Sequence, residues 1–377
     1  MISVIICRQP IYAAEQPEQS KLYSMSAAVI DGENGRVLFE KNGNEIRPMA
    51  STTKIMTLIV TLENSDTDQL VTISSYASKM PDVQLNVKEH EQYRLIDLIY
   101  SMMLESHNDS AVAIAEHVAG SVDGFANMMN AKAREIGLSD TYFITSNGLD
   151  ATDEQGTHST TAIELSKIMR YCTMISPQKD KFIEICQTMT HTFSDYTNHR
   201  TFTVNNKNKM LTMMDGVLAG KTGFTADAGY CYVVAIERED KTIMIALLGC
   251  GWPSNKNYKW KDTLYLSNLV FDNYQRKQIW TKDEELCPLY IFDGEKNVQL
   301  PVGYDETVSL LLCDTDCIDT KVDYYVDAAP IEEGDIVGKI SIYVNDALYQ
   351  EISIYAQETI RKKTLTYYLD KIIHLFL

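Results

Sequence analysis

The sequence predicts an α+β fold in which an antiparallel sheet is assembled from both ends of a long first domain and helices form the middle. Two hairpin patterns carry this prediction, because each places two β-rich runs around a polar turn, one near residue 33 and one near residue 240. The chain between them contains apolar and Ala-rich stretches of helical length. Beyond about residue 283 short β runs follow, which predicts a small all-β domain, and the last residues predict a short amphipathic helix.

The first elements are a hairpin and a buried helix. Residues 26–30 and 36–40 are β-rich and flank the Gly-rich turn 31–35. A proline then opens an apolar run, residues 47–62, that is long enough to form a largely buried helix. Ser51 lies near the start of this predicted helix.

Ser51 and Lys54 form an S-x-x-K motif. Residues three apart on a helix share a face, so the Lys54 amine can reach the Ser51 hydroxyl. A serine becomes a nucleophile when a base takes its proton, and a lysine is such a base when burial or a second cation, here Lys221, lowers its pKa. The alternative is that Ser51 caps the helix and Lys54 extends to solvent. A second S-x-x-K, Ser176 to Lys179, contains a proline and is interpreted as a loop.

Ser106 and Asn108 form an S-x-N motif around His107, in a predicted loop between the apolar stretch 95–104 and the Ala-rich helical stretch 110–119. The Ser106 hydroxyl can pass a proton to a leaving amine, and the Asn108 amide can orient both a lysine and a substrate carbonyl. A helix cap without chemistry is the alternative interpretation.

Lys221, Thr222 and Gly223 form a K-T-G motif ahead of the second hairpin, whose β-rich runs are residues 230–236 and 242–248. The motif is therefore expected on or just before a sheet strand. A lysine ammonium and a threonine hydroxyl can bind a carboxylate, and a glycine lets a substrate backbone approach closely. A solvated turn is the alternative for an isolated K-T-G.

Together these motifs make the chain resemble the low-molecular-mass penicillin-binding proteins, specifically the serine-type D-Ala-D-Ala carboxypeptidases of the peptidase S11 group. The resemblance covers roughly residues 25 to 280 and implies the penicillin-binding, serine β-lactamase-like fold. His107 is a departure, since many relatives carry glycine there, and we expect it to tune the site. The segments that carry the resemblance are 50–57, 106–110, 146–150, 158–162, 206–211 and 220–225.

The resemblance implies acyl transfer without a cofactor or metal: Ser51 attacks the penultimate carbonyl of a stem pentapeptide, terminal D-alanine leaves, and the acyl-enzyme is hydrolysed. Lys54 would be the base, Ser106 the proton relay, and Asn108 would hold the substrate amide. Penicillins and other β-lactams would acylate the same serine. The remaining expected roles are a carboxylate clamp by Lys221 and Thr222, an oxyanion hole from the backbone N–H groups of Ser51 and Phe224, close approach at Gly223, and help with the carboxylate from Lys259.

Two alternatives belong to the same fold. A class A-like β-lactamase is disfavoured, because the interval between Ser106 and Lys221 contains no E-x-x-L-N segment that would supply a deacylating glutamate. Glu164 and Glu184 have other neighbours, and Glu164 is expected to face solvent on a helix. A non-catalytic wall-binding protein, or a penicillin sensor that acylates and stalls, is the second alternative.

The C-terminal tail combines a basic run, residues 361–363, with apolar residues at helical spacing. Fourteen residues from Thr364 to the end cannot span a bilayer as a helix. The tail therefore predicts an interfacial membrane anchor, with a helix docked on the protein as the alternative. The apolar residues are Leu365, Tyr368, Leu369, Ile372 and Phe376.

Four segments follow from these observations: a leader remnant, the carboxypeptidase domain, a β domain that the resemblance implies is a spacer, and the membrane-associating tail. Residues 1–20 are a weak match to a signal peptide, so export to the extracytoplasmic face of the cell membrane is inferred chiefly from the substrate. The expected bounds are 1–20, 21–282, 283–357 and 358–377.

The composition excludes other classes. A net charge of −18 argues against a nucleic-acid surface. The eight cysteines show neither a disulfide framework nor zinc spacing, and free buried thiols are expected, with a Cys172–Cys186 pair as the alternative. Asp314, Asp316 and Asp319 lack the glycine and final glutamate of a calcium loop.

Overall fold

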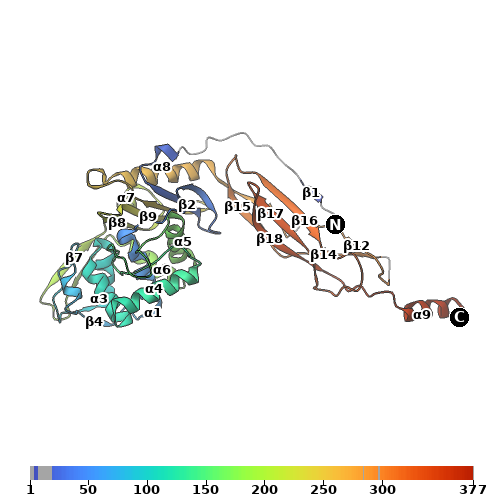
Figure 1. The fold of residues 1–377 in the computed structure, drawn as a ribbon, viewed down its shortest axis with the longest axis horizontal. Coiled ribbons are helices and arrows are strands. Elements are labelled where there is room, and N and C mark those ends of the chain that lie inside the picture. Colours follow the sequence, from blue (N-terminus) through green and yellow to red (C-terminus); the bar gives the residue numbers. More distant parts are fainter. Residues whose placement is uncertain (1–3, 7–18, 283, 296–297, 377) are drawn as a thin grey trace. The chain divides into compact units, whose positions relative to one another are not determined.

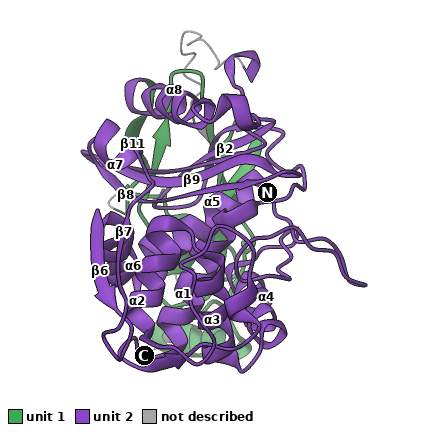
Figure 2. Ribbon diagram, turned by 90° about the vertical axis from the view of Figure 1, so that its left-hand side faces the viewer, with its two compact units in different colours: residues 1–15, 273–377 green, residues 16–272 purple. Residues whose placement is uncertain are grey.

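The computed structural model describes residues 4–6, 19–282, 284–295 and 298–376. The chain forms two compact units (Figures 1 and 2), the larger comprising Gln16–Asp272 and the smaller comprising Asn273–Leu377 together with Met1–Glu15.

The larger unit contains a five-stranded antiparallel sheet in the order β3-β2-β10-β9-β8. The two predicted hairpins pair with each other through β2 and β10, where Val29 lies opposite Ile245. The sheet is therefore assembled from both ends of the domain, and the predicted fold class is confirmed. The strands are β2 Ser26–Asp31, β3 Val37–Lys41, β8 Val217–Thr225, β9 Gly229–Arg238 and β10 Lys241–Leu248.

Helices cover both faces of this sheet, which explains why β2 and β10 are buried along their whole length. Figure 2 shows α8 on one side of the sheet and the main helical region on the other. On the first side the Trp260 ring of α8 packs edge-on against Tyr232 of β9. On the second, α5 contacts β2, β9 and β10. The helices concerned are α5 Ala162–Arg170 and α8 Tyr258–Asn273.

At the centre of the helical region lies α1, Lys54–Asn64, with every residue from Lys54 to Leu62 buried. The predicted largely buried helix is thus confirmed. Its neighbours include α3 Asn108–Ala119 and the π-helical turn Ser101–Glu105, which continues α2 Leu95–Tyr100. The other elements are α4 Val122–Ile136, the π-helical turn Tyr171–Ile175, α6 Lys179–Gln187, α7 Met210–Met213, and the strand pairs β4 Leu70–Thr72 with β5 Gln92–Arg94 and β6 Thr190–Ser194 with β7 Thr201–Asn205.

The smaller unit is mostly β structure with its own apolar core. A five-stranded sheet has the order β1-β16-β17-β18-β14, and two further strand pairs are β11 with β15 and β12 with β13. The strands are β1 Val4–Ile6, β11 Gln275–Trp280, β12 Leu289–Ile291, β13 Val298–Leu300, β14 Val302–Gly303, β15 Val308–Leu312, β16 Ile318–Tyr324, β17 Ile336–Val344 and β18 Ala347–Ala356.

The chain ends in helix α9, Leu365–Phe376. Within the described ranges, no helix combines the length and apolar character needed to cross a membrane. Most of the expected leader, residues 1–3 and 7–18, lies outside the described residues, while Val4–Ile6 pairs with β16.

The cysteines of the described part of the chain are free thiols, and Cys172 is not bonded to Cys186. The expectation that the thiols are buried is wrong for Cys287 and Cys317, which are exposed. Cys7 lies outside the described residues. Nor do three or more His, Cys, Asp or Glu side chains among the described residues gather into a metal-binding group.

Candidate active site

Ser51 lies in the 3-10 turn Ala50–Thr53 that leads into α1. The turn is tight, since Ala50 has a left-handed φ of 48°. Two glycines make room for it: a Cβ on Gly148 would lie 2.1 Å from the Ala50 carbonyl oxygen, and one on Gly223 would lie 2.8 Å from the Ser51 nitrogen. Gly223 is thus required by the packing of strand β8 against the Ser51 turn, whatever it does for a substrate.

The Lys54 amine is completely buried and contacts three oxygen atoms. Its Nζ lies 2.8 Å from Ser51 Oγ, 2.9 Å from Asn108 Oδ1 and 2.5 Å from the Asn147 carbonyl oxygen. Burial, followed by the positive charge of Lys221, holds the pKa of Lys54 well below its usual value. A neutral amine has two N–H donors and one lone pair. The carbonyl oxygens of Asn108 and Asn147 accept the two N–H groups, which leaves the lone pair for the Ser51 hydroxyl proton.

Lys221 and Ser106 form the second polar contact of the site. Lys221 Nζ donates to Ser106 Oγ at 2.9 Å and to the Thr222 carbonyl oxygen at 3.0 Å. Burial lowers the pKa of Lys221 to about 7. Ser106 has a left-handed φ of 70° and ends the π-helical turn. The predicted loop is confirmed for Ser106 and His107, whereas Asn108 is the first residue of α3. The loop meets strand β8 where Ser106 contacts Lys221.

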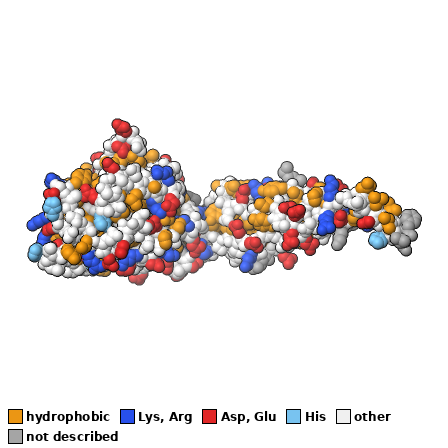
Figure 3. Space-filling model, turned by 90° about the horizontal axis from the view of Figure 1, so that it is seen from below, with side chains coloured by type: hydrophobic (Ala, Val, Ile, Leu, Met, Phe, Trp, Pro, Cys, Tyr) orange, Lys and Arg blue, Asp and Glu red, His pale blue; other side chains and the backbone are white. Residues whose placement is uncertain are grey.

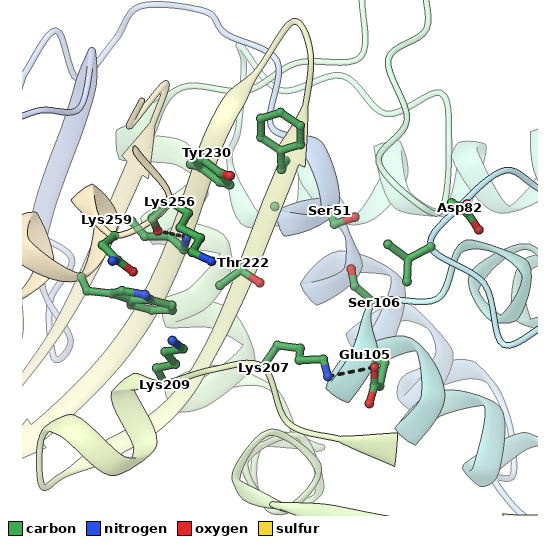
Figure 4. Close-up of a pocket in the computed structure, with 15 residues that line it drawn as sticks. Ser51, Asp82, Glu105, Ser106, Lys207, Lys209, Thr222, Tyr230, Lys256 and Lys259 are labelled. Carbon is green, nitrogen blue, oxygen red and sulfur yellow. Dashed lines mark hydrogen bonds and ion pairs between the residues drawn. The ribbon is translucent and has the colours of Figure 1, made fainter. Parts of the chain in front are cut away.

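These side chains surround a cleft of about 590 Å³ (Figure 4). The structure brings all nine predicted site residues together. Ser51, Ser106, Thr222, Gly223, Phe224 and Lys259 line the cleft. Lys54 and Lys221 are connected to it by their hydrogen bonds to Ser51 and Ser106, and Asn108 by its hydrogen bond to Lys54.

Lys259 is buried at one end of the cleft between two aromatic rings. Its Nζ lies 4.4 Å from the centre of the Tyr230 ring and 4.8 Å from that of Trp260, and it donates to the Lys256 carbonyl oxygen. Burial lowers the pKa of Lys259 to about 8. The Lys209 and Lys256 side chains line the same end (Figure 4). A chain of strongly negative net charge thus gathers three lysines at this end of the cleft.

The opposite wall of the cleft includes Asp82 and Val83, which sequence reasoning missed. Asn108 Nδ2 donates to the carbonyl oxygens of Pro81 and Asp82, both at 3.1 Å, and the Asn108 backbone N–H donates to Val83. Asn108 therefore holds this wall as well as Lys54. Sequence reasoning also missed the Asn147 carbonyl oxygen as an acceptor for Lys54. Segment 146–150 carries part of the family resemblance, but a backbone acceptor leaves no side-chain pattern.

The expectation that Glu164 faces solvent is wrong. Its side chain is only 5% exposed, and it accepts hydrogen bonds from the Ser139 and Asp140 backbone N–H groups and the Thr141 hydroxyl. The carboxylate fixes the loop after α4, because backbone N–H groups buried there need an acceptor. Glu184, in contrast, is paired with Lys181 at the surface.

Glu164→Ala is expected to lower the free energy of unfolding by about 3 kcal/mol, since several hydrogen bonds to a charged acceptor are lost and buried donors remain unpaired. Thermal unfolding would measure the change. Glu184→Ala is the matched control and should change stability by less than about 0.5 kcal/mol. Equal effects of the two substitutions would contradict a structural role for Glu164.

The second S-x-x-K behaves as the proline indicated. Ser176 lies in the turn before α6 and donates to Glu63 Oε1 at 2.5 Å, while Lys179 is exposed at the start of that helix.

Comparison with known proteins gives consistent matches over both units. A family model described as D-alanyl-D-alanine carboxypeptidase, peptidase S11, matches residues 13–250, and a model described as the penicillin-binding protein 5 C-terminal domain matches residues 274–362. The D-alanyl-D-alanine carboxypeptidase DacF of Bacillus subtilis is 26% identical over 359 residues, covering 92% of this chain and 88% of the relative.

Solved structures show the same fold. The D-alanyl-D-alanine carboxypeptidase DacD from Francisella tularensis superimposes with a TM-score of 0.74 at 20% identity, covering 95% of this chain and 98% of that one. Penicillin-binding protein D2 from Listeria monocytogenes, solved in an ampicillin-bound form, has a TM-score of 0.58 at 27% identity and covers 68% of this chain and 100% of that one.

Proposed function

Because this chain belongs to the peptidase S11 family of D-alanyl-D-alanine carboxypeptidases, we propose that Ser51 is the nucleophile with which it carries out the family's reaction. The protein is a serine-type carboxypeptidase of peptidoglycan stem peptides that end in D-Ala-D-Ala. The observation that supports Ser51 most directly is the contact of its hydroxyl with a buried lysine of lowered pKa.

In the proposed reaction, Lys54 Nζ takes the Ser51 proton while Oγ bonds to the penultimate carbonyl carbon. The bond from that carbon to the nitrogen of the terminal D-alanine then breaks, and the leaving amine receives a proton through Ser106. Water hydrolyses the Ser51 ester and restores the hydroxyl. The backbone N–H groups of Ser51 and Phe224 are proposed as the oxyanion hole, since each such donor contributes about 3 kcal/mol to acyl transfer.

The terminal carboxylate is proposed to bind Lys221 and Thr222, with Lys259 as a second cation. Both lysines are buried and carry lowered pKa values, so each loses its charge within a unit or two of neutral pH. A deprotonated amine no longer attracts a carboxylate.

The KM for a peptide ending in a free carboxylate is therefore expected to rise as pH increases through about 7 to 8, by up to about tenfold per unit. Steady-state kinetics between pH 6 and 9.5 would measure it. A peptide of the same sequence with a C-terminal amide is the control, because it lacks the charge. A KM that rises equally for both peptides would exclude Lys221 and Lys259 as the carboxylate clamp.

Incubation of the protein with a tripeptide ending in D-Ala-D-Ala, and separately with a labelled penicillin, tests this function. We expect D-alanine release and a penicillin adduct. Rapid penicillin turnover without D-alanine release would favour a class A-like β-lactamase instead. A stable adduct without any peptide hydrolysis would favour a penicillin sensor. The Glu164 carboxylate accepts hydrogen bonds from the loop after α4, so it is not available as a deacylating base. This weighs against the class A-like β-lactamase.

We also propose that α9 is an interfacial membrane anchor. Leu365, Leu369 and Ile372 are each at least 49% exposed and fall on one stripe of the helix. Tyr367 lies about 200° around the helix from Leu365, and its hydroxyl donates to the Glu295 carbonyl oxygen. The face turned toward the domain is therefore the one opposite the apolar stripe, which weighs against the docked-helix alternative. Figure 3 shows hydrophobic side chains gathered on the surface of this helix.

Replacing Leu369 and Ile372 together by serine is expected to weaken binding to vesicles containing anionic lipid by at least about tenfold, because two apolar side chains lose their burial in the interface. Co-sedimentation would measure the change. His374→Ser, on another face of α9, should leave binding within about twofold. Unchanged binding of the double variant would rule out this stripe as the anchor.

Peptidoglycan lies outside the cytoplasm, and the relatives act on the cell wall. We therefore propose that residues 1–20 serve as a leader for export. The exported protein is then attached to the extracytoplasmic face of the cell membrane.

A further inference from the structure

His107 lies between Ser106 and Asn108 in the sequence, and both of these residues have a role in the proposed reaction. No role has been assigned to His107 itself. Ser106 contacts Lys221 from the loop before α3, and Asn108 contacts Lys54 from the first residue of α3. The imidazole of His107 is 7% exposed and does not line the cleft. The S-x-N motif thus has its two outer side chains in the site and its central side chain in the helical core.

The buried ring is held by the hydroxyl of Ser101, which is in turn bonded to that of Ser110. His107 Nδ1 lies 2.8 Å from Ser101 Oγ, and Ser101 Oγ lies 2.8 Å from Ser110 Oγ. Ser101 opens the π-helical turn that follows α2, and Ser110 lies in the first turn of α3. A hydroxyl donates one hydrogen bond and accepts others, so Ser101 can bond to the neutral ring and to Ser110 at the same time. The ring therefore connects the loop to the helices on both of its sides.

The neutral form is favoured at this position. Burial is the largest influence and lowers the pKa of His107, with Asp109 and Glu105 acting in the opposite direction and Lys54 and Lys207 acting with it.

The backbone beside the ring needs such support. Ser106 has a φ of 70°, a left-handed conformation that is uncommon for residues other than glycine and persists where the surroundings hold it. A π-helical turn, the element that Ser106 ends, is likewise rare and is often found at functional sites. Relaxation of this loop would move Ser106 Oγ relative to Lys221 and Asn108 Oδ1 relative to Lys54.

We infer that His107 is a positioning residue for the acylation step: its imidazole, fixed by Ser101, holds Ser106 and Asn108 against the two lysines of the site. The inference rests on the proposed function of Ser51. It assigns His107 no contact with substrate, and its effect passes through the two neighbouring residues.

The test compares full-length His107→Ala and His107→Asn with the parent protein. The rate of acylation by a fluorescent penicillin is divided by the endpoint adduct, which counts only folded, reactive sites. For His107→Ala we expect this rate per site to fall by about 10- to 100-fold, the size of effect that a small misplacement produces. In His107→Asn, whose amide can bond to Ser101, the rate should remain within about threefold of the parent.

Two further variants sharpen the test. Ser101→Ala removes the partner of the ring and should also slow acylation, and the double variant with His107→Ala should be no slower than the worse single variant, because both act through one contact. His117→Ala, in the last turn of the same helix α3, is the matched control and should acylate at the parental rate.

Parental rates per site in His107→Ala would overturn the inference, as would equal losses in His107→Ala and His107→Asn. A lower endpoint adduct with an unchanged rate would show a role in folding alone and would overturn it too. These results differ from failure of the proposed function, in which the parent protein itself forms no adduct.

Discussion

Ser51→Ala is expected to abolish both the penicillin adduct and the release of D-alanine, lowering peptide hydrolysis by about 10⁴-fold or more. The reason is that the covalent intermediate needs the Ser51 oxygen, and no other hydroxyl contacts the Lys54 amine in the described part of the chain. The measurement is mass spectrometry of the protein after incubation with penicillin, together with an assay of free D-alanine.

The fold should survive this substitution. Ser51 is only partly buried, and apart from the Lys54 amine its Oγ has a long contact of 3.2 Å with the Asn147 carbonyl oxygen. A midpoint of thermal unfolding within a few degrees of that of the parent protein would establish that the fold is retained. Ser176→Ala, in the other S-x-x-K, is the matched control and should retain the adduct and the hydrolysis. An adduct that persists in Ser51→Ala would remove the proposed nucleophile.

Lys54→Met is expected to lower the acylation rate by about 10³-fold, because the nucleophile loses its general base. Methionine retains much of the length of the lysine side chain but cannot accept the Ser51 proton. The substitution leaves Asn108 Oδ1 and the Asn147 carbonyl oxygen without the Lys54 donor, so thermal unfolding must be measured beside the kinetics.

Lys54→Arg separates the loss of the general base from the loss of the hydrogen-bond donor. Arginine keeps a cationic donor for the carbonyl oxygens but stays protonated at all accessible pH values, so it is expected to be as inactive as methionine. In the parent protein, acylation should decrease as pH falls through the lowered pKa of Lys54, since the ammonium form has no lone pair. A rate within tenfold of the parent in Lys54→Arg would refute the role of Lys54 as a base.

Much of this site could be predicted because its chemistry depends on local spacing. Ser51 and Lys54 share a helical face at any S-x-x-K in a helix, and the proline in the second copy identified it as a loop. The two hairpins were predictable for a similar reason, since alternation and turn residues act within a few positions. That the sheet is assembled from both ends of the domain followed from the positions of the hairpins, whereas the order of its strands came from the structure.

Other features depend on partners distant in sequence and were not predictable. Glu164 is polar and helical. It is buried because the loop after α4 folds over it and donates backbone N–H groups to its carboxylate. The Asn147 carbonyl oxygen and the wall at Asp82 and Val83 belong to the same class, because backbone groups and loop positions carry no residue pattern.

The sequence by itself determined which groups this protein has for chemistry: a serine with a lysine one helical turn away, a second serine with an amide, and a lysine on a strand. The tertiary structure decided the protonation of the two lysines. Burial lowers the pKa of both Lys54 and Lys221, because a charge removed from water is costly, and the positive charge of Lys221 lowers the pKa of Lys54 further. That burial exists only once α1, the S-x-N loop and β8 have packed together.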